Sequence, residues 1–475
     1  MSVVRQMAFD AAAKRLAIAA DKLITIKSDT LLTAQVAKVP AAMTIDYNST
    51  GKFEIERWVR GVKAWRFLAT PVTTASSPLI SAAWQEGGST APNYGTLITG
   101  PTGSTGMDAV TPAYSMKWYD ETINNYKPIT NTGTPLVKST GYMLFVRADR
   151  TLPLSGDKKA TNLRIRGQIN TQNQPFNIGV DAVQSVGNPY PSAISFPQMI
   201  APSQTANADI QRAYTAWDPL LNSATNAGAY QYISANNDPP YSADPAGTEL
   251  YANEALYPNI ESGQAVYLKN SSTVNPVSGV ITEDMKATGS RLASREVPTV
   301  ADRQFLRTRL YTATGMLVDG NLVALDDEFA NSIDRDDAVK FTNSGENFGI
   351  LRNGKKLAIE ARGRLVEKDT IQFSMLNMKE QAYQLKIIPK RLAGVNLQAI
   401  FVDKFLQTET PVSLSADTNF IPVVITAAAA SKAADRFMIV FKSMAGPLPV
   451  NFVSITAQRQ ADRSIAVNWK VANEI

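Results

Sequence analysis

The sequence predicts an all-β protein made of tandem β-sandwich modules of jelly-roll-like or immunoglobulin-like type. Only 19% of the 475 residues are charged, and the chain carries 27 glycines and 26 prolines. Short apolar runs alternate with polar residues, and turn-forming residues separate these runs at regular intervals. This composition and spacing are typical of many short strands joined by turns, and they argue against helix bundles.

The first 50 residues allow two interpretations. The alanines at positions 11–13 favour helix, so a helix over residues 8–20 is one of them. Apolar residues nevertheless recur with the near-twofold spacing of a strand, at Leu16, Ile18, Leu23, Ile24 and Ile26. We expect residues 1–50 to be strand-rich and to form the end of a short β-solenoid-like stretch.

Residues 51–299 are expected to form a β-rich domain with long loops. Near its start Phe53 and Ile55 alternate with Glu54 and Glu56, so the two faces of this predicted strand differ in polarity. Further strands are expected at residues 143–147, 163–169 and 265–268. Residues 73–112 and 200–255 are rich in turn-forming or polar residues and predict loops.

Residues 300–445 are expected to form a β-sandwich of jelly-roll-like type. Eight apolar runs at regular spacing indicate its strands, at residues 305–311, 322–325, 357–360, 370–376, 383–388, 399–403, 420–425 and 437–441. The segment AGPLP that follows predicts a linker. Residues 446–475 then predict a hairpin that opens an incomplete immunoglobulin-like module. A hairpin alone is marginally stable in water, so we expect it to need a neighbour.

The chain contains neither cysteine nor histidine. Disulfides, thiolate nucleophiles, histidine-based triads and metals held by Cys or His are therefore excluded. Any catalysis would have to use carboxylates, Lys or Tyr. The net charge is +5, but the basic residues do not cluster with interleaved aromatic side chains, so no nucleic-acid partner is expected.

No apolar run approaches the roughly 18–20 residues that a helix needs to span a bilayer, so no transmembrane segment is expected. Charged residues follow Met1 where the apolar core of a signal peptide would lie. If the protein is exported, we therefore expect this chain to derive from a longer precursor.

An acidic segment is the one candidate metal site. Within twelve residues the chain carries Asp326, Asp327, Glu328, Asp334, Asp336 and Asp337. Calcium takes about six to eight oxygen ligands and tolerates irregular loops, so Asp326, Asp327, Asp334, Asp336 and Asp337 are candidate Ca²⁺ ligands. The spacing is not that of an EF-hand and Arg335 can neutralise a carboxylate, so a solvated loop is the alternative.

Two further groups of residues have both a structural and a ligand-binding interpretation. Four tryptophans form either core positions or a platform on which sugar rings stack: Trp65, Trp84, Trp118 and Trp217. A charged group either binds a ligand carboxylate or forms internal ion pairs: Arg147, Asp149 and Arg150. The segment GNPYPS at residues 187–192 predicts a structural corner, because Asn and Pro favour turns.

A series of motifs occurs in a fixed order along the chain. The first unit carries KAWRFLATPV (63–72), WQEGG (84–88), YGTLITG (94–100), GYMLFVRADR (141–150), VGNPYPSAI (186–194), WDP (217–219), IESGQA (260–265) and ITE (281–283). The remainder carries DAVKFTN (337–343), GKKL (354–357), ADRF (434–437), LPVNFVS (448–454) and NWKVANE (468–474). In these motifs and their order, the chain resembles the large modular surface proteins that Bacteroidota export through the type IX secretion system.

This resemblance implies β-rich modules, interaction with a secretion machinery, and display on the outer-membrane surface or release from it. It implies no single activity. The C-terminal sorting domain of that family has no counterpart in this sequence, so export by this route rests on the other motifs.

The function expected from these observations is a non-enzymatic structural or adhesive cell-surface protein, such as a filament or stalk subunit. Its expected partners are neighbouring modules or protomers and surface glycans. The alternative is a carbohydrate-binding module or a glycan-active enzyme, because two carboxylates can hydrolyse a glycoside without histidine.

Overall fold

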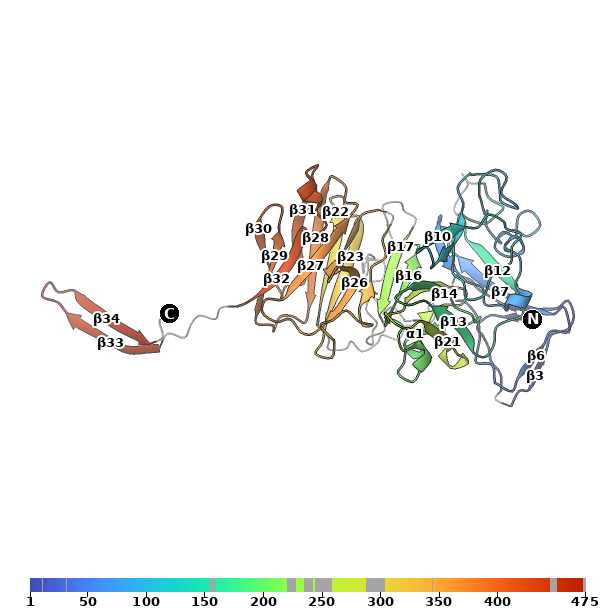
Figure 1. Cartoon of the computed structure of the whole chain (residues 1–475), viewed down its shortest axis with the longest axis horizontal. Coiled ribbons are helices and arrows are strands. Elements are labelled where there is room, and N and C mark those ends of the chain that lie inside the picture. The colour runs from blue at the N-terminus through green and yellow to red at the C-terminus, as the bar shows by residue number, and fades with distance from the viewer. Residues whose placement is uncertain are drawn as a thin grey trace.

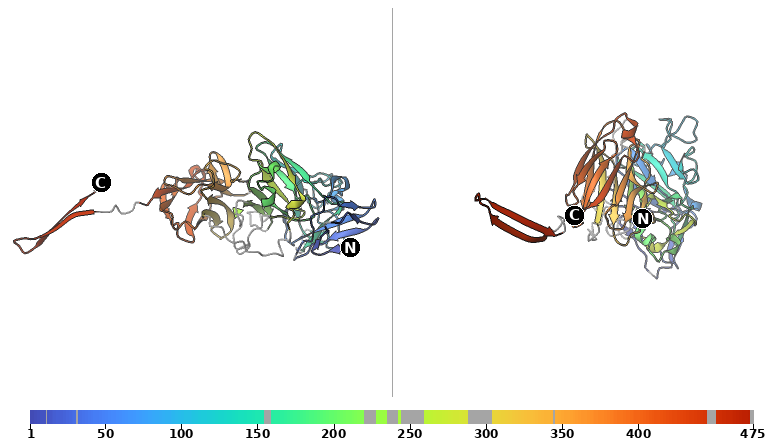
Figure 2. Two further views of the ribbon diagram at one scale, coloured as in Figure 1. Left: turned by 90° about the horizontal axis from the view of Figure 1, so that it is seen from below. Right: turned by 60° about the vertical axis from the view of Figure 1, so that its left-hand side comes forward.

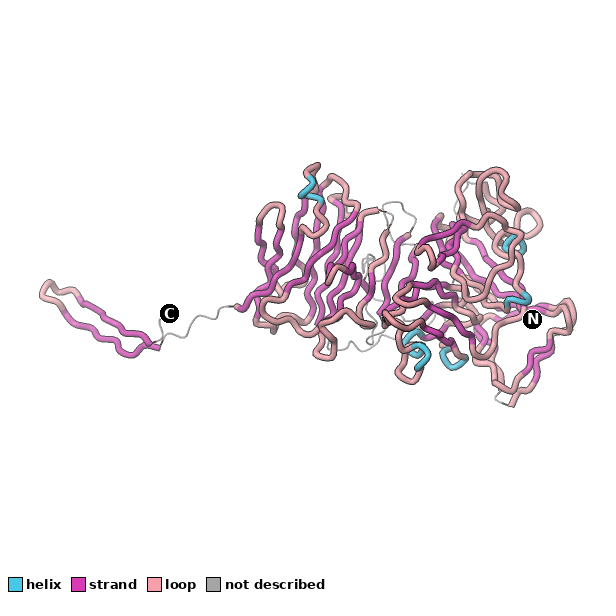
Figure 3. Tube along the Cα trace, in the orientation of Figure 1, coloured by secondary structure: helices cyan, strands magenta, loops and turns pink. Residues whose placement is uncertain are grey.

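The computed structural model describes residues 1–10, 12–30, 32–153, 159–219, 228–234, 242–243, 259–287, 304–343, 345–444 and 451–472. Strands account for 47% of it and helices for 5%. Figure 3 shows the few short helices at the edges of a body made of strands and loops. The predicted all-β fold is therefore confirmed.

The first 55 residues coil into a parallel β-structure. Strand β4 (Leu23–Ile26) pairs in parallel with β7 (Lys52–Val59), and Thr25 Oγ1 donates to Glu54, a residue 29 positions further along. Two other parallel pairs repeat this offset: β2 (Gln6–Met7) with β5 (Gln35–Val36), and β3 (Arg15–Ala17) with β6 (Thr44–Asp46). Strand β4 also pairs in parallel with β1, 23 positions earlier, and stacked parallel turns of this kind are the geometry of a solenoid. The helix considered over residues 8–20 does not form.

The coil shares its core with the following strands. Strand β1 (Ser2–Val3) lies in one sheet with β4, β7 and β12 (Thr161–Gly167). A second sheet contains β8 (Ala64–Leu68), β9 (Met116–Asp120), β10 (Asn125–Pro128) and β11 (Tyr142–Val146). One apolar cluster runs through both sheets, from Val3 to Ile169. Residues 1–50 therefore pack as part of the first unit.

Strand β7 buries both of its faces. Phe53 and Ile55 enter the apolar core as the alternation predicts. The two glutamates on the other face are also buried, at 6% and 2% exposure for Glu54 and Glu56. Arg166 Nε donates to Glu54 at 2.7 Å and Lys27 Nζ to Glu56 at 2.9 Å. The polar face of this strand thus meets cations of neighbouring strands.

The second half of the first unit is built on a five-stranded sheet. Its order is β14 (Val183–Gly187), β20 (Ala265–Lys269), β16 (Ala213–Asp218), β17 (Ala229–Ser234) and β18 (Ser242–Ala243). Smaller pairs flank it: β13 (Gln174–Ile178) with β21 (Val277–Ile281), and β15 (Ile194–Ser195) with β19 (Asn259–Ile260), beside the short helix α1 (Phe196–Met199).

The prediction of a loop over residues 200–255 is wrong where β16 and β17 form. Tyr214, Ala216 and Ile233 on these strands belong to the apolar core, a burial that weak local patterning did not indicate. Much of the remainder of that segment lies outside the described residues.

The second unit is one eleven-stranded sheet. Its strands are β22 (Gln304–Thr312), β23 (Leu317–Leu325), β24 (Ala338–Val339), β25 (Asn347–Arg352), β26 (Lys355–Arg362), β27 (Thr370–Leu376), β28 (Ala382–Lys390), β29 (Leu397–Asp403), β30 (Thr408–Val412), β31 (Asn419–Val424) and β32 (Phe437–Ser443). All eight predicted strands lie within it, and one apolar cluster extends from Leu306 to Phe441.

The two ends of this sheet meet. Strands β30 and β31 end the strand order on opposite sides, yet Asn419 Nδ2 donates to the Ser413 carbonyl at 2.9 Å and Ser413 N–H to Asn419 Oδ1 at 2.8 Å. The sheet therefore curls around its core, as in the predicted sandwich (Figure 1). The jelly-roll type stays a prediction.

The predicted hairpin is present as β33 (Asn451–Arg459) and β34 (Ile465–Ala472). Ile455 lies opposite Trp469, and Val467 is on the same face. These three side chains are 61%, 66% and 48% exposed, so the apolar face is open to solvent. The predicted linker at 445–449 lies outside the described residues.

Aromatic side chains join the two units. Figures 1 and 2 show β16 and β17 beside the sandwich, with the solenoid at the far end of the first unit. Tyr232 of β17 donates its hydroxyl hydrogen to the Phe341 carbonyl at 3.1 Å and accepts from the Phe341 N–H. One apolar cluster contains Tyr232 together with Leu322 and Ile359 of the second unit.

Candidate functional site

The acidic residues of the predicted calcium site are spread along the connection between β23 and β24. Exposed Asp327 pairs with Arg364 at 2.9 Å, and Asp336 lies 3.6 Å from Arg212. Asp326 and Asp334 accept hydrogen bonds from the N–H groups of residues 328 and 336. Across the described ranges no three acidic side chains gather as a metal site requires. The calcium site therefore remains a prediction that this geometry does not support.

Asp337, the fifth candidate ligand, is a buried structural residue. It is 0% exposed, and its carboxylate accepts hydrogen bonds from the N–H groups of Asp334 and Ala361 at 2.9 and 3.0 Å. Burial raises its pKa to about 7, although these bonds and the charge of Arg352 act in the opposite direction. Through the bond from Ala361, Asp337 attaches the connection between β23 and β24 to β26.

The tryptophans divide between core and partly exposed positions. Trp84 is 2% exposed and packs edge-to-face on Tyr142, so it belongs to the core. Trp65, Trp118 and Trp217 are half-buried. They do not form one platform, because Trp65 and Trp118 point to opposite faces of their sheet.

The charged group near residue 150 forms internal contacts. Arg150 makes a two-pronged contact with Asp108 at 2.6 and 2.7 Å. The buried carboxylate of Asp149 accepts from the Asn93 and Thr151 N–H groups. The ion-pair interpretation therefore fits Arg150, whereas Asp149 binds backbone N–H groups and Arg147 donates to the Thr99 hydroxyl.

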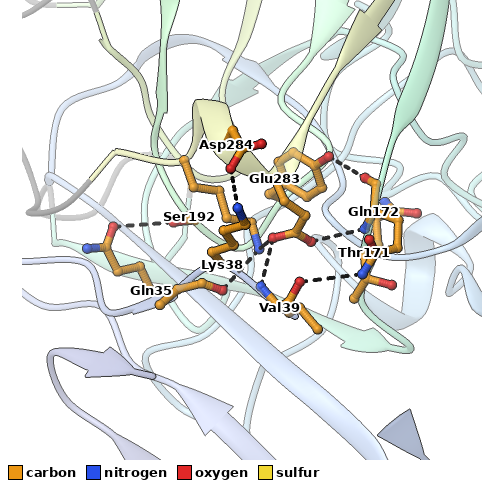
Figure 4. A network of polar contacts seen from close by, with 12 residues as sticks. Gln35, Lys38, Val39, Thr171, Gln172, Ser192, Glu283 and Asp284 are labelled. Atoms are coloured by element: carbon orange, nitrogen blue, oxygen red, sulfur yellow. Dashed lines mark hydrogen bonds and ion pairs between the residues drawn. The ribbon is translucent and has the colours of Figure 1, made fainter. Parts of the chain in front are cut away.

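The segment at residues 187–192 forms the predicted corner. Asn188 Nδ2 donates to the carbonyls of Ser192 and Ile260, and buried Tyr190 donates to Ile281. Figure 4 shows the adjoining polar junction, in which Glu283 accepts from the N–H groups of Val39 and Gln172. These contacts attach the solenoid to the second half of the first unit, so the motifs concerned are structural.

A tyrosine cleft of about 470 Å³ lies where the two units meet. Its aromatic residues come from segments far apart in the chain: Tyr119 of β9, Tyr126 of β10, Tyr230 of β17 and Phe341 after β24. Polar residues complete the lining, namely Asn124, Asn125, Lys340 and Thr342, together with Val183 and Val339. No described lining residue is acidic.

Hydrogen bonds hold the aromatic walls of the tyrosine cleft. The hydroxyls of Tyr126 and Tyr230 are 3.0 Å apart, and Tyr126 also contacts the Tyr267 hydroxyl. Burial raises the pKa of Tyr119 to about 12 and that of Tyr126 well above its ordinary value, so both phenols stay neutral. The Lys117 ammonium lies 4.1 Å from the Tyr126 ring centroid, which fixes this ring further.

The floor of the tyrosine cleft is held by a buried ion pair. Lys340 Nζ lies 2.8 Å from Asp319, and both side chains are almost fully buried. Asp319 in turn accepts from the Phe348 N–H at 2.7 Å. The pair anchors the segment that carries Phe341 to the second unit.

Aromatic faces with neighbouring amides and hydroxyls suit a polar ligand that has apolar faces. A sugar ring has this character, since its C–H groups stack on aromatic rings while its hydroxyls bind amides. The sequence did not predict this site, because only the tryptophans were considered as a platform for sugar rings. The one available signal was that residues 119, 126, 230 and 341 are aromatic. These residues come together only when the chain folds.

Comparisons with protein-family models, curated proteins and solved structures gave no match to this chain. Among the residues that the structure describes, no helix is both long and apolar enough to cross a membrane. The function is therefore inferred from the residues of this chain and from their arrangement.

Proposed function

We propose that this protein is a non-enzymatic, adhesive cell-surface protein that binds glycans in the tyrosine cleft. The single observation that carries the proposal is the set of neutral aromatic walls with amide and hydroxyl groups at their rim. The lack of an acidic group among the described lining residues favours binding over glycoside hydrolysis, which uses a pair of carboxylates.

Export to the outer-membrane surface is part of this proposal. It is supported by the resemblance of the ordered motifs to those of type IX-secreted proteins of Bacteroidota. This route of export is tested by labelling intact cells with an antibody against the protein, before and after inactivation of the type IX machinery. Surface labelling that is independent of this machinery would contradict that route of export.

The binding proposal is tested on a glycan array with the wild-type protein and three variants. Phe341→Ala removes an aromatic wall, and Asn125→Ala removes an exposed amide that accepts a hydrogen bond from the backbone N–H of the next residue. Phe420→Ala is the matched control, because this ring is 59% exposed on β31, outside the cleft lining. We expect about tenfold weaker binding for Phe341→Ala, a smaller loss for Asn125→Ala and no change for the control.

An array on which the wild-type protein binds no glycan would contradict the proposal. Equal binding by wild type and Phe341→Ala would also contradict it. Release of reducing sugar from a bound polysaccharide would instead favour the glycan-active enzyme.

A structural role is favoured by a separate observation, the exposed apolar face of β33 and β34. A lone hairpin is marginal and an open apolar face tends to be covered, so we propose that it packs on a neighbouring module or protomer. Mass photometry should then show assemblies that Trp469→Lys shifts toward the single chain. A wild-type protein that is a single chain at all concentrations would contradict this role.

A further inference from the structure

A second pocket, of about 480 Å³, lies in the second unit, away from the tyrosine cleft. This arginine pocket lies over β25, β26 and β27 and is lined by Asn331, Leu351, Arg352, Asn353, Glu360, Arg362, Asp369, Thr370 and Gln372. Its volume is within the roughly 300–1,000 Å³ of small-ligand sites. Leu351 is its only apolar lining residue among those described, so recognition in it is polar.

The two arginines hold more donors than their neighbours use. Arg362 donates to Asp369 at 2.7 Å and to the Thr370 carbonyl at 3.3 Å, while its buried Nε has no hydrogen-bond partner among the described residues. Arg352 donates to the Asn331 carbonyl, and its buried Nη1 makes an ion contact with Glu360 without a well-directed hydrogen bond. Buried donors left without a partner cost free energy. These two nitrogens are closed off from solvent, so a ligand in the pocket would have to use the other guanidinium N–H groups of Arg352 and Arg362.

Glu360 decides what kind of acceptor fits. Its Oε1 lies 2.9 Å from Arg352 and 3.4 Å from Arg362, and its side chain is 2% exposed. Both arginines thus already share one carboxylate, and Asp369 neutralises Arg362 further. A second anion would meet this negative charge at close range. Burial also raises the pKa of Glu360, while the charges of Arg362 and Arg352 act in the opposite direction.

A neutral hydroxyl satisfies both kinds of group. It accepts from a guanidinium N–H and donates to a carboxylate oxygen. Two neighbouring hydroxyls of one sugar ring can each accept from one arginine and donate to the carboxylate that lies between the two arginines. Amides at the rim, from Asn353 and Gln372, offer further contacts of the same kind.

We propose that the arginine pocket binds a single neutral sugar unit through adjacent ring hydroxyls, held between Arg352, Glu360 and Arg362. This site is separate from the tyrosine cleft and does not depend on it. Two glycan sites on one chain would let the protein hold a polymer at two points, which raises the overall affinity without new contacts.

The test is calorimetric titration of the whole chain with the methyl glycosides of glucose, galactose, mannose and N-acetylglucosamine, and with methyl glucuronide as the anionic arm. Glu360→Gln removes the carboxylate, with Glu409→Gln as matched control because Glu409 is 59% exposed. Gln372→Ala removes an amide of the pocket lining and serves if Glu360→Gln fails to fold. We expect a neutral glycoside to bind, and both pocket variants to weaken it about tenfold while the control does not.

Three results would overturn the proposal: no binding of any neutral glycoside, tighter binding of the glucuronide, or unchanged binding in Gln372→Ala and Glu360→Gln. Asn125→Ala separates the two sites. If it abolishes glycoside binding while Gln372→Ala preserves it, the sugar lies in the tyrosine cleft. If Asn125→Ala weakens binding to the polymer on the array and leaves binding of the glycoside unchanged, each site binds its own ligand.

Discussion

At the scale of single residues, close backbone packing fixes several turns of the first unit. Gly95 has a φ of +68°, and a Cβ at this position would overlap the Glu86 carbonyl. Thr161 Oγ1 donates to the Gly95 carbonyl at 2.7 Å, which holds the same turn against β12. Gly87 and Gly95, one in each of the motifs at 84–88 and 94–100, therefore have a steric reason that the sequence does not state.

Gly95→Ala should lower the free energy of unfolding by about 3 kcal/mol, since it adds both left-handed strain and a steric overlap. Gly103→Ala is the matched control, with a φ of +92° but nothing within 4 Å of the added Cβ. It should cost only about 1 kcal/mol. Urea unfolding measures both. Equal losses would show that strain alone acts.

Asp337 should make stability depend on pH. Its pKa is 3.8 when unfolded and about 7 when folded, so the folded protein binds more protons between these values. Stability should therefore fall as the pH rises from about 4 to about 7, by up to about 4 kcal/mol. Thermal unfolding from pH 4 to 8 should show this slope reduced in Asp337→Asn and unchanged in Asp327→Asn. A slope that both variants share with wild type would contradict the assignment.

At the scale of elements, the curled sheet of the second unit is joined at its ends by one arginine. Arg436 is 1% exposed and makes a two-pronged contact with Asp403 of β29 at 2.6 and 2.8 Å. Its third nitrogen donates to the carbonyls of Val424 on β31 and of Ser431. It therefore bonds to strands from both ends of the strand order.

Arg436→Lys should destabilise the second unit by about 3 kcal/mol, because an ammonium cannot reproduce the planar fork in a buried site. Arg364→Lys, at a 60% exposed position paired with Asp327, should change stability by less than about 0.5 kcal/mol. The midpoint of guanidinium unfolding gives both values. A mild effect at Arg436 would mean that packing alone closes the sheet.

The strands that the sequence failed to predict lack an apolar alternation. In β30 the first four residues are exposed, and Pro411 interrupts the run. Strand β25 contains Gly349, whose added Cβ would meet the Lys340 side chain. In β9, Lys117 and Trp118 are half-buried beside buried Tyr119. These segments form strands because neighbouring strands offer them an edge with which to pair. Local propensity does not encode such pairing.

At the scale of the whole molecule, an aromatic interface couples the two units. Tyr232 reaches Phe341 across 109 positions of the sequence, and Tyr230 packs on the same ring with centroids 5.4 Å apart. The tyrosine cleft lies at this interface, so a ligand bound there, as proposed, would contact both units.

Tyr232→Phe should weaken that coupling. It keeps the ring but leaves the Phe341 N–H and carbonyl without the hydroxyl, at a cost of about 1–3 kcal/mol. Calorimetry should show the unfolding transitions of the two units further apart than in wild type. Tyr383→Phe is the control, because its hydroxyl bonds to Glu346 within the second unit. A single shared transition in both variants would mean that other contacts dominate the interface.

The sequence by itself determined the all-β class, the solenoid-like start, eight of the eleven strands of the second unit and the terminal hairpin. These depend on alternation, turn residues and composition, which act over a few neighbouring positions. The tertiary structure decided where the sites lie. Tyr126, Tyr230 and Phe341, or Arg352 and Arg362 around Glu360, become neighbours only when sheets pack and curl. A local pattern carries no information on such long-range contacts.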